Sequence, residues 1–367
     1  MLEIQQEFLP DWFSKPSDSL LTIMKRRGVS VEALANSVEG GMSTFRNLLT
    51  GTQVIDQTLA VALSKSVGGS VEFWMKRQAV YEDALRRTAH ADIENMDRWL
   101  SVPTPSAKPR GRLSQAQKVQ QLCERLAFYG VNNLDTWHRR YGLLIDETQF
   151  RKSPTFDSNE AATSLWLRQG ELTAALTTTD PWQPAVLRSL LQQIVHLSRI
   201  RHPHLFLPKL RSLAAQAGVA IAIVRAPKGC RASGASRMLT PEKAMVLLSF
   251  RHLSDDHFWF TLFHEFAHLL LHNNQTFIDT DDTEVDQRER EANDFARLCI
   301  IPTTDIEKFE DLKPTRESIL RFSIKLGIAP GLIVGQLQHR GAVPPDKFNY
   351  LKRRWQWHEI ESASANL

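Results

Sequence analysis

The stretch from Asp256 to His272 constrains the fold most, because it has the pattern of one uninterrupted helix that carries several polar side chains. Asp256 stands in the position of an N-cap, and neither proline nor glycine follows before His272. Apolar residues recur at helical spacing, at Phe260, Phe263, Ala267 and Leu271. We therefore expect an amphipathic helix over 256–272.

This helix contains the sequence His264-Glu265-Phe266-Ala267-His268. Residues four apart lie above one another on a helix face, so both imidazoles can reach one zinc ion. Glu265 lies one step round the helix, where its carboxylate can act as a general base on water that the ion activates. The competing interpretation is that these histidines are ordinary core residues. A second carboxylate-bearing helix further along the chain favours the metal site.

Two histidines leave a catalytic zinc ion short of one protein ligand. The candidates are His272 and the acidic residues of 279–291, of which 279–286 has the composition of a loop. Residues 291–302 indicate a helix that proline ends, and Glu291 precedes Phe295 by one turn, so we predict that Glu291 is the third ligand.

Further side chains are expected to support the histidines from outside the ligand set. Asp294 is the first candidate for a hydrogen bond to a histidine, and Asn293 is the second. His272 is expected to be another supporting or packing residue, one turn beyond His268.

Upstream, 219–224 and 243–249 have the pattern of buried strands, and 227–236 that of a loop between them. The second strand leads directly into the histidine helix. Its free edge could pair with an extended peptide and hold a peptide bond over the metal.

The motif at 264–272, Glu291-Ala-Asn-Asp-Phe-Ala296 and Ile300-Ile-Pro302 together resemble the ImmA/IrrE family of zinc peptidases. The resemblance implies a zincin-like domain of the gluzincin type, with Zn²⁺ bound by His264, His268 and Glu291. It also implies cleavage of helix-turn-helix repressors. For the donor that stabilises the oxyanion we consider His339, Arg237 and His272, and we select His339, which follows an expected helix near 332–338.

The N-terminal part has a run of short helical patterns separated by glycines between 18 and 90. Residues 27–35, 44–51 and 70–75 resemble the XRE-type helix-turn-helix of HigA-like antitoxins. The resemblance implies a recognition helix that opens after Gly40-Gly41 at 43–47, with Ser43, Thr44, Arg46 and Asn47 nearest DNA. The alternative is a helical bundle kept for dimerisation or partner docking.

Composition sets the remaining limits. The 367 residues allow two or three domains, and 42% hydrophobic with 23% charged residues is ordinary for a globular protein. Neither a leader-like start nor a run of eighteen apolar residues occurs, so we expect a cytoplasmic location without membrane contact. A net charge of +4 permits nucleic-acid binding without demanding it. Three scattered cysteines argue against a disulfide framework.

The expected fold class is mainly α with a small β-sheet. We expect a helix-turn-helix domain over 1–98, an exposed linker over 99–112, a helical segment over 113–155, a peptidase domain over 156–340 and a basic tail over 341–367.

The functional hypothesis is a zinc-dependent endopeptidase with a DNA-binding-type regulatory domain. Its expected partners are a repressor or a toxin-antitoxin or phage-related protein as substrate, operator DNA, and a second copy bound through the N-terminal domain. The alternative is an antitoxin-like repressor with a structural or sensory metal site. A third hypothesis is a partner-binding scaffold that lacks both activities.

Overall fold

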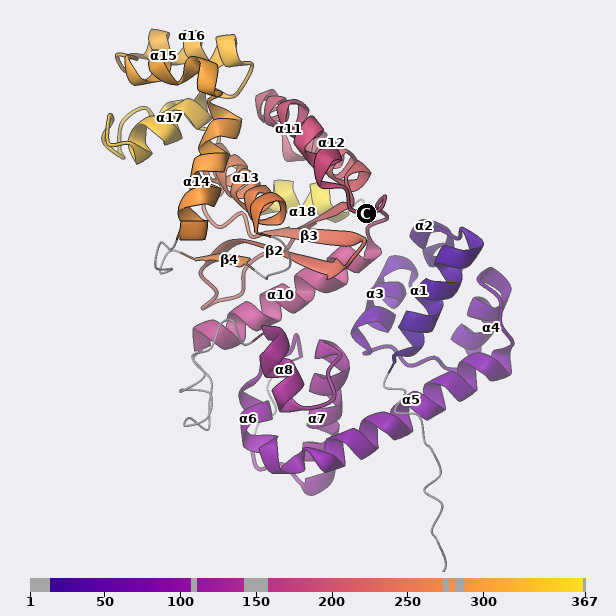
Figure 1. Ribbon diagram of the computed structural model, residues 1–367. Helices are drawn as coiled ribbons and strands as arrows, with labels where there is room; N and C mark the ends of the chain where they lie inside the picture. Colours follow the sequence, from indigo (N-terminus) through magenta and orange to yellow (C-terminus); the bar gives the residue numbers. More distant parts are fainter. Residues whose placement is uncertain (1–13, 107–110, 142–157, 273–276, 281–286, 366–367) are drawn as a thin grey trace, which may run out of the picture. The chain divides into compact units, whose positions relative to one another are not determined.

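The computed structural model describes residues 14–106, 111–141, 158–272, 277–280 and 287–365. The chain divides into two compact units, Met1–Leu165 and Trp166–Leu367, with helix α10 (Ser158–Leu176) running across the division. Unit 1 is helical where it is described, and unit 2 combines helices with one small sheet (Figure 1). This confirms the expected fold class, mainly α with a small β-sheet.

Unit 1 is built from short helices whose ends follow local sequence signals. Side chains of Ser30, Asp56, Ser70 and Ser114 each accept a hydrogen bond from a backbone N–H three residues on, which satisfies one of the unpaired donors at a helix start. The helices are α1 (Pro16–Arg27), α2 (Val31–Ala35), α3 (Gly41–Thr50), α4 (Gln57–Ser66), α5 (Val71–Ala91), α6 (Met96–Ser101), α7 (Gln115–Tyr129) and α8 (Leu134–Tyr141).

Helix α3 begins at Gly41, two residues before the predicted start at Ser43. Gly40 is the N-cap with a φ of 79°, a left-handed conformation that glycine adopts without a Cβ clash. A Cβ on Gly40 would lie 2.3 Å from Thr44 Oγ1, which donates a hydrogen bond to the carbonyl of Glu39 at 2.6 Å. The two glycines therefore form a close turn into α3, and the second of them belongs to the helix.

The start of the predicted linker packs inside unit 1. Val102 is buried and its carbonyl accepts a hydrogen bond from Arg125 Nε at 3.0 Å, while the carbonyl of Pro103 accepts one from the Tyr129 hydroxyl at 2.8 Å. Both donors lie on α7, so 101–103 is fixed to this helix. Residues 107–110 of the predicted linker, and 142–157 around the predicted start of the peptidase domain, lie outside the described residues.

Unit 2 contains a sheet with the strand order β1-β3-β2-β4, from β1 (Val219–Ile223), β2 (Ala232–Thr240), β3 (Lys243–Leu248) and β4 (Phe277–Thr280). Strands β1 and β3 are parallel, whereas β2 runs antiparallel to both of its neighbours. The two predicted strands are observed, but the prediction of a loop over 227–236 is wrong for β2. Its small residues have weak strand propensity, and hydrogen bonds to β3 and β4 on both sides hold it.

The position of β3 overturns a further prediction. Because β1 and β2 flank β3, this strand has no open edge for a substrate. Among the described residues, the outer strands of the sheet are β1 and β4.

Helix α13 (Asp255–Leu271) lies in the centre of unit 2, against β2 and β3 on one side and α14 (Gln287–Ile300) and α17 (Pro330–His339) on the other. The predicted helix is observed, but it is buried almost throughout from Phe258 to Leu270 and lacks the exposed polar face of an amphipathic helix. The N-cap is Ser254, and Asp256 lies in the first turn.

The rest of unit 2 encloses this centre. It comprises α11 (Pro184–His196), α12 (Pro203–Gln216), α15 (Ile306–Glu310), α16 (Arg316–Leu326) and α18 (Trp357–Ala365). No single described helix is long and apolar enough to cross a membrane; α16 and α17 pass that test only as a pair bent by 115°.

The predicted basic tail over 341–367 is instead part of unit 2. Helix α18 packs on α12, and Ile360 is fully buried. Trp355 is buried with its Nε1 donating to the carbonyl of Arg201 at 2.9 Å. The apolar residues of 341–367 are widely spaced among charged ones, so the sequence does not indicate that this segment packs in a core.

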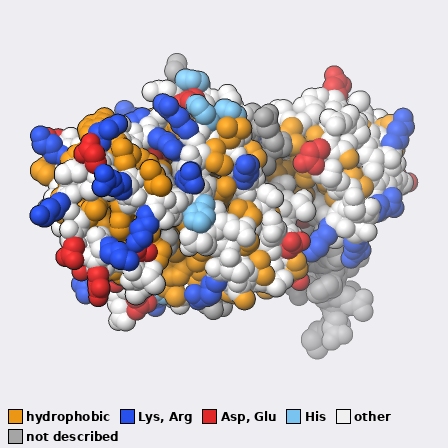
Figure 2. Space-filling model, turned by 90° about the horizontal axis from the view of Figure 1, so that it is seen from above, with side chains coloured by type: hydrophobic (Ala, Val, Ile, Leu, Met, Phe, Trp, Pro, Cys, Tyr) orange, Lys and Arg blue, Asp and Glu red, His pale blue; other side chains and the backbone are white. Residues whose placement is uncertain are grey.

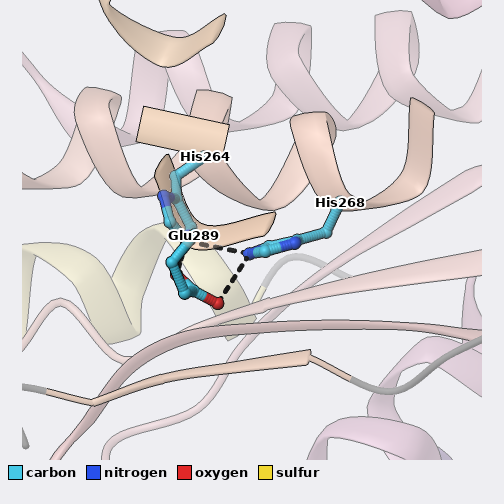
Figure 3. A group of neighbouring side chains, drawn as sticks. All are labelled: His264, His268 and Glu289. Carbon is cyan, nitrogen blue, oxygen red and sulfur yellow. Dashed lines mark hydrogen bonds and ion pairs between the residues drawn. The ribbon is translucent and has the colours of Figure 1, made fainter. Parts of the chain in front are cut away.

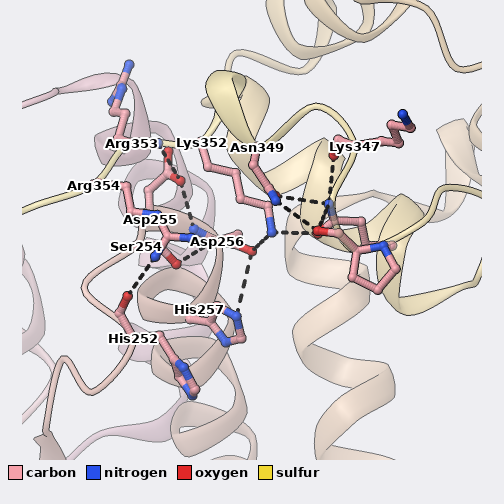
Figure 4. Close-up of polar contacts among 12 residues, drawn as sticks. His252, Ser254, Asp255, Asp256, His257, Lys347, Asn349, Lys352, Arg353 and Arg354 are labelled. Atoms are coloured by element: carbon pink, nitrogen blue, oxygen red, sulfur yellow. Dashed lines mark hydrogen bonds and ion pairs between the residues drawn. The ribbon is translucent and has the colours of Figure 1, made fainter.

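The segment before α18 also binds the first turn of α13 (Figure 4). Asp255 Oδ1 accepts hydrogen bonds from the backbone N–H groups of Asp256 and Arg353, at 2.9 and 3.0 Å. Asp256 pairs with Lys352 at 2.5 Å, and Ser254 donates to it at 2.6 Å. Burial, with the neighbouring Asp256 charge, raises the pKa of Asp255 to about 7.

We expect the stability of wild-type unit 2 to fall as the pH rises from about 4 to about 7, because folded Asp255 keeps a proton that the unfolded chain has lost. Asp255→Asn removes this charge and should stabilise unit 2 above pH 7, by an amount up to about 4 kcal/mol, while changing little below about pH 4, where both states keep the proton. Thermal unfolding of both proteins at pH 3.5 and pH 8 measures the effect. Equal differences at the two pH values would contradict it.

Candidate metal centre

His264 and His268 lie one turn apart on α13 and point their Nε2 atoms at each other, 2.9 Å apart (Figure 3). Both side chains are buried. The pair forms because the spacing of four residues places both rings on one helix face. Glu289 and Asn293 of α14 lie against that face.

Glu289, in the first turn of α14, completes this group. Its Oε2 lies 3.1 Å from His264 Nε2, and its Oε1 lies 3.4 Å from His268 Nε2. Its side chain is only 15% exposed. The prediction that Glu291 faces these two histidines is wrong: Glu291 is 46% exposed and its Oε2 lies 2.9 Å from His272 Nε2.

The start and phase of α14 explain the error. The helix begins at Gln287, before the predicted start, and its buried stripe is formed by Ala292, Ala296 and Ile300. Glu289 lies three residues before Ala292 and so shares that face, whereas Glu291 is about 200° further round the helix than Glu289. The inner face of α14 is defined by Ala292 and Ala296, whereas Phe295 is only half-buried. A prediction based on the two alanines gives Glu289 as the third ligand.

The second ring nitrogens of both histidines also have partners. Asn293 Oδ1 lies 3.0 Å from His264 Nδ1, so a proton on Nδ1 can be donated to the amide oxygen, which makes Nε2 the lone-pair nitrogen. His272 Nδ1 lies 3.1 Å from His268 Nδ1. Asp294, the first choice for this supporting role, is 71% exposed on the far side of α14 and lies near Arg297.

Burial strongly favours the neutral form of His268. Desolvation, with the neighbouring His264 and His272, lowers the pKa of His268 to about 3. A metal ligand must present an unprotonated nitrogen, so His268 is ready for coordination at neutral pH without losing a proton first.

Glu265 is fully buried and lies against β2. A Cβ built on Gly234 of this strand would be 2.5 Å from Glu265 Oε1 and 2.6 Å from Thr261 Cγ2. The absence of a side chain at Gly234 therefore makes the space that the Glu265 carboxylate occupies. The sequence gives no sign of this role for Gly234, because 227–236 has the composition of a loop.

The three candidates for the oxyanion donor lie in different places. His339 is exposed at the end of α17, and its ring centroid is 6.3 Å from that of Phe260, which is itself 6.3 Å from His264. Arg237 pairs with Glu171 of α10 at 2.7 Å. His272 contacts His268 and Glu291. Of the three, only His272 touches a histidine of the pair.

The predicted DNA-contacting residues lie along α3 of unit 1. Ser43, Arg46 and Asn47 are exposed, and Thr44 is half-buried.

None of the three cysteines belongs to the donor group of the metal centre. Burial raises the pKa of Cys299 to about 12, so its thiol stays protonated at neutral pH.

The donor atoms of His264, His268 and Glu289 all lie within 4.8 Å of one another. Two imidazoles and one carboxylate form a donor set typical of catalytic zinc, which leaves a coordination position for water or substrate. The residues therefore fit a divalent transition-metal ion.

A helix that carries a His-Glu-x-x-His sequence beside a second helix with a carboxylate defines a site of the metallopeptidase type. Residues 219–332 match the family described as the IrrE N-terminal-like domain, peptidase family M78. The matched region runs from β1 to the start of α17 and includes every residue of the metal centre. No curated protein matches the chain.

Proposed function

We propose that this chain is a zinc-dependent endopeptidase whose centre is formed by His264, His268 and Glu289. The observation that carries the proposal is that Glu289 of α14 meets both histidines of α13, the helix that also carries Glu265. All four residues lie inside the region that matches a peptidase family. Glu289 takes the place that the sequence analysis gave to Glu291.

A bound zinc ion would supply Lewis acidity toward the scissile carbonyl and toward water. The residues of the chain do the rest. Glu265 takes a proton from the attacking water and delivers it to the leaving amine. Asn293 and His272 orient the two ligand rings. His339, on the exposed end of α17, remains our candidate donor to the oxyanion.

The substrate class that we propose is a transcriptional repressor or a toxin-antitoxin or phage-related partner protein. The resemblance of the peptidase region to ImmA/IrrE proteins supports it, as does the resemblance of the N-terminal region to XRE-type domains. A chain that reads DNA and cuts proteins could direct its peptidase to a repressor at a promoter.

The test is a comparison of newly formed protein N-termini in a cell lysate from the source organism, after incubation with the zinc-loaded chain or with its Glu265→Gln variant. We expect termini that only the wild type produces, because glutamine cannot accept the proton. If both proteins bind zinc and neither produces new termini, the metal site is structural or sensory, and the antitoxin-like repressor becomes the better interpretation.

We also propose that unit 1 binds DNA through α3, because Arg46 and Asn47 are exposed on this helix after a close turn. Selection from a library of randomised DNA duplexes should enrich a sequence for the wild type. Arg46→Ala or Asn47→Ala should weaken binding to that sequence by roughly 10- to 100-fold, the value of a base contact of about 1–3 kcal/mol. Arg26→Ala, which removes an exposed cation from α1, serves as the control. A library without any enriched sequence would contradict DNA reading.

A further inference from the structure

A pocket of about 230 Å³ opens in unit 2 between α14, α15 and α17. Its apolar part comes from Ile301, Ile306 and Phe309, of which Ile301 and Phe309 are buried. Its polar lining consists of Arg297, Glu310, Gln336, His339 and Arg340. This pocket is smaller than the roughly 300–1,000 Å³ of sites for drug-sized ligands. It has room for one large side chain.

The charged lining of the pocket is more positive than negative. It contains two guanidinium groups, those of Arg297 and Arg340, and one carboxylate, that of Glu310. Arg340 lies over the Phe309 ring, 5.0 Å from its centroid, and donates to the backbone carbonyl of Glu310 at 3.1 Å, which holds its cation at the rim. Arg297 has a long ion pair with the exposed Asp294, at 3.9 Å. An acidic group on a ligand would complement this rim.

Residues of α14 and α17 connect the pocket with the metal centre. Arg297 lies one turn beyond Asn293 on α14, about 6 Å along the helix axis, and Asn293 contacts His264. On α17, His339 lines the pocket and packs against Phe260, whose ring also neighbours His264. An extended peptide advances about 3.3 Å per residue, so the pocket lies about two to four residues from a bond held at the metal centre.

We propose that this pocket is a specificity subsite of the peptidase. It binds a large apolar side chain of the protein substrate, about two to four residues from the bond that is cut. The Arg297 and Arg340 cations select an acidic residue next to that side chain. The proposal rests on the function proposed above and names the sequence that the enzyme prefers.

The surrounding surface suits a protein ligand. Helices α15, α16 and α17 lie at the top of Figure 1 and face the viewer at the left of Figure 2, where hydrophobic side chains lie among side chains of both charges. A substrate segment that presents an apolar side chain with charged neighbours can contact such a mixed face, and the two arginines of the pocket favour an acidic neighbour.

The test uses zinc-loaded Glu265→Gln protein as a binding reagent, probed with an array of extended peptides in which each position is varied. We expect peptides with Phe, Leu or Met beside Asp or Glu to bind at least about tenfold more tightly than those with Ala at the apolar position. Adding Ile306→Trp, which fills the pocket, should abolish this preference. Adding Arg297→Glu should change the preferred neighbour from acidic to basic.

Matched controls place the same changes outside the pocket. Ile324→Trp alters a side chain that is 75% exposed, and Arg321→Glu reverses an exposed charge on α16. Both should leave the peptide preference unchanged, and equal thermal unfolding midpoints would show that all variants are folded.

Binding without an apolar preference, or a preference that Ile306→Trp leaves intact, would overturn the subsite. The proposed function fails separately. If the array shows the expected preference but wild-type enzyme leaves the selected peptides uncut, the pocket binds peptides and the chain is not an endopeptidase toward them.

Discussion

Glu289→Gln is expected to lower the affinity for zinc by more than the roughly 10- to 100-fold that loss of an outer hydrogen-bond partner causes. The carboxylate of Glu289 lies within 3.4 Å of both ligand histidines, and no other described carboxylate joins their donor group. A neutral amide is a poorer zinc ligand than a carboxylate, so peptide hydrolysis should be lost together with the metal. Elemental analysis and competition with a zinc-binding dye measure the effect.

Glu291→Gln is the matched control, since it makes the same chemical change two residues away on the same helix. Glu291 touches His272 and not the ligand pair, so we expect at most the outer-shell effect of about 10- to 100-fold. Asn293→Ala should fall in that same range, because Asn293 fixes the tautomer of His264. If Glu291→Gln lost the metal and Glu289→Gln kept it, the metal would be bound by the face of α14 that carries Glu291, as the sequence predicts.

The histidines could be predicted because their chemistry depends on spacing within one helix. His264, Glu265 and His268 are adjacent in the sequence, and a single helical turn fixes their geometry. The carboxylate ligand lies on a second helix, so its identity depends on the rotation of α14 about its axis. A short amphipathic pattern leaves that rotation uncertain by a residue or two, which is the difference between Glu289 and Glu291.

The fold was predictable where local signals dominate and not where tertiary contacts decide. Ser30, Asp56 and Ser70 each cap a helix with a side chain of the type that N-cap positions favour. By contrast, β2 consists of small residues that favour loops, and partner strands on both sides make it a strand. The segment around Trp355 looks like a basic tail until its packing is seen.

Gly234→Ala is expected to lower peptide hydrolysis by roughly 10²- to 10⁴-fold, the contribution of a positioned general base, while zinc remains bound. The new Cβ would lie 2.5 Å from Glu265 Oε1, closer than nonbonded atoms approach, so the carboxylate must move. Neither ligand histidine is among the atoms nearest to this Cβ. The measurements are the rate of hydrolysis and the zinc content of the same preparation.

A general loss of stability would also reduce activity, so the experiment needs a second glycine. Gly170→Ala places a Cβ 2.4 Å from Leu247 Cδ2, an equally severe contact in the same unit that does not touch Glu265. Both variants should lower the unfolding midpoint, because overpacking a core costs about 1–3 kcal/mol. Only Gly234→Ala should lose hydrolysis per folded, zinc-loaded molecule. Equal losses in the two variants would mean that packing of the sheet, and not the position of Glu265, controls the rate.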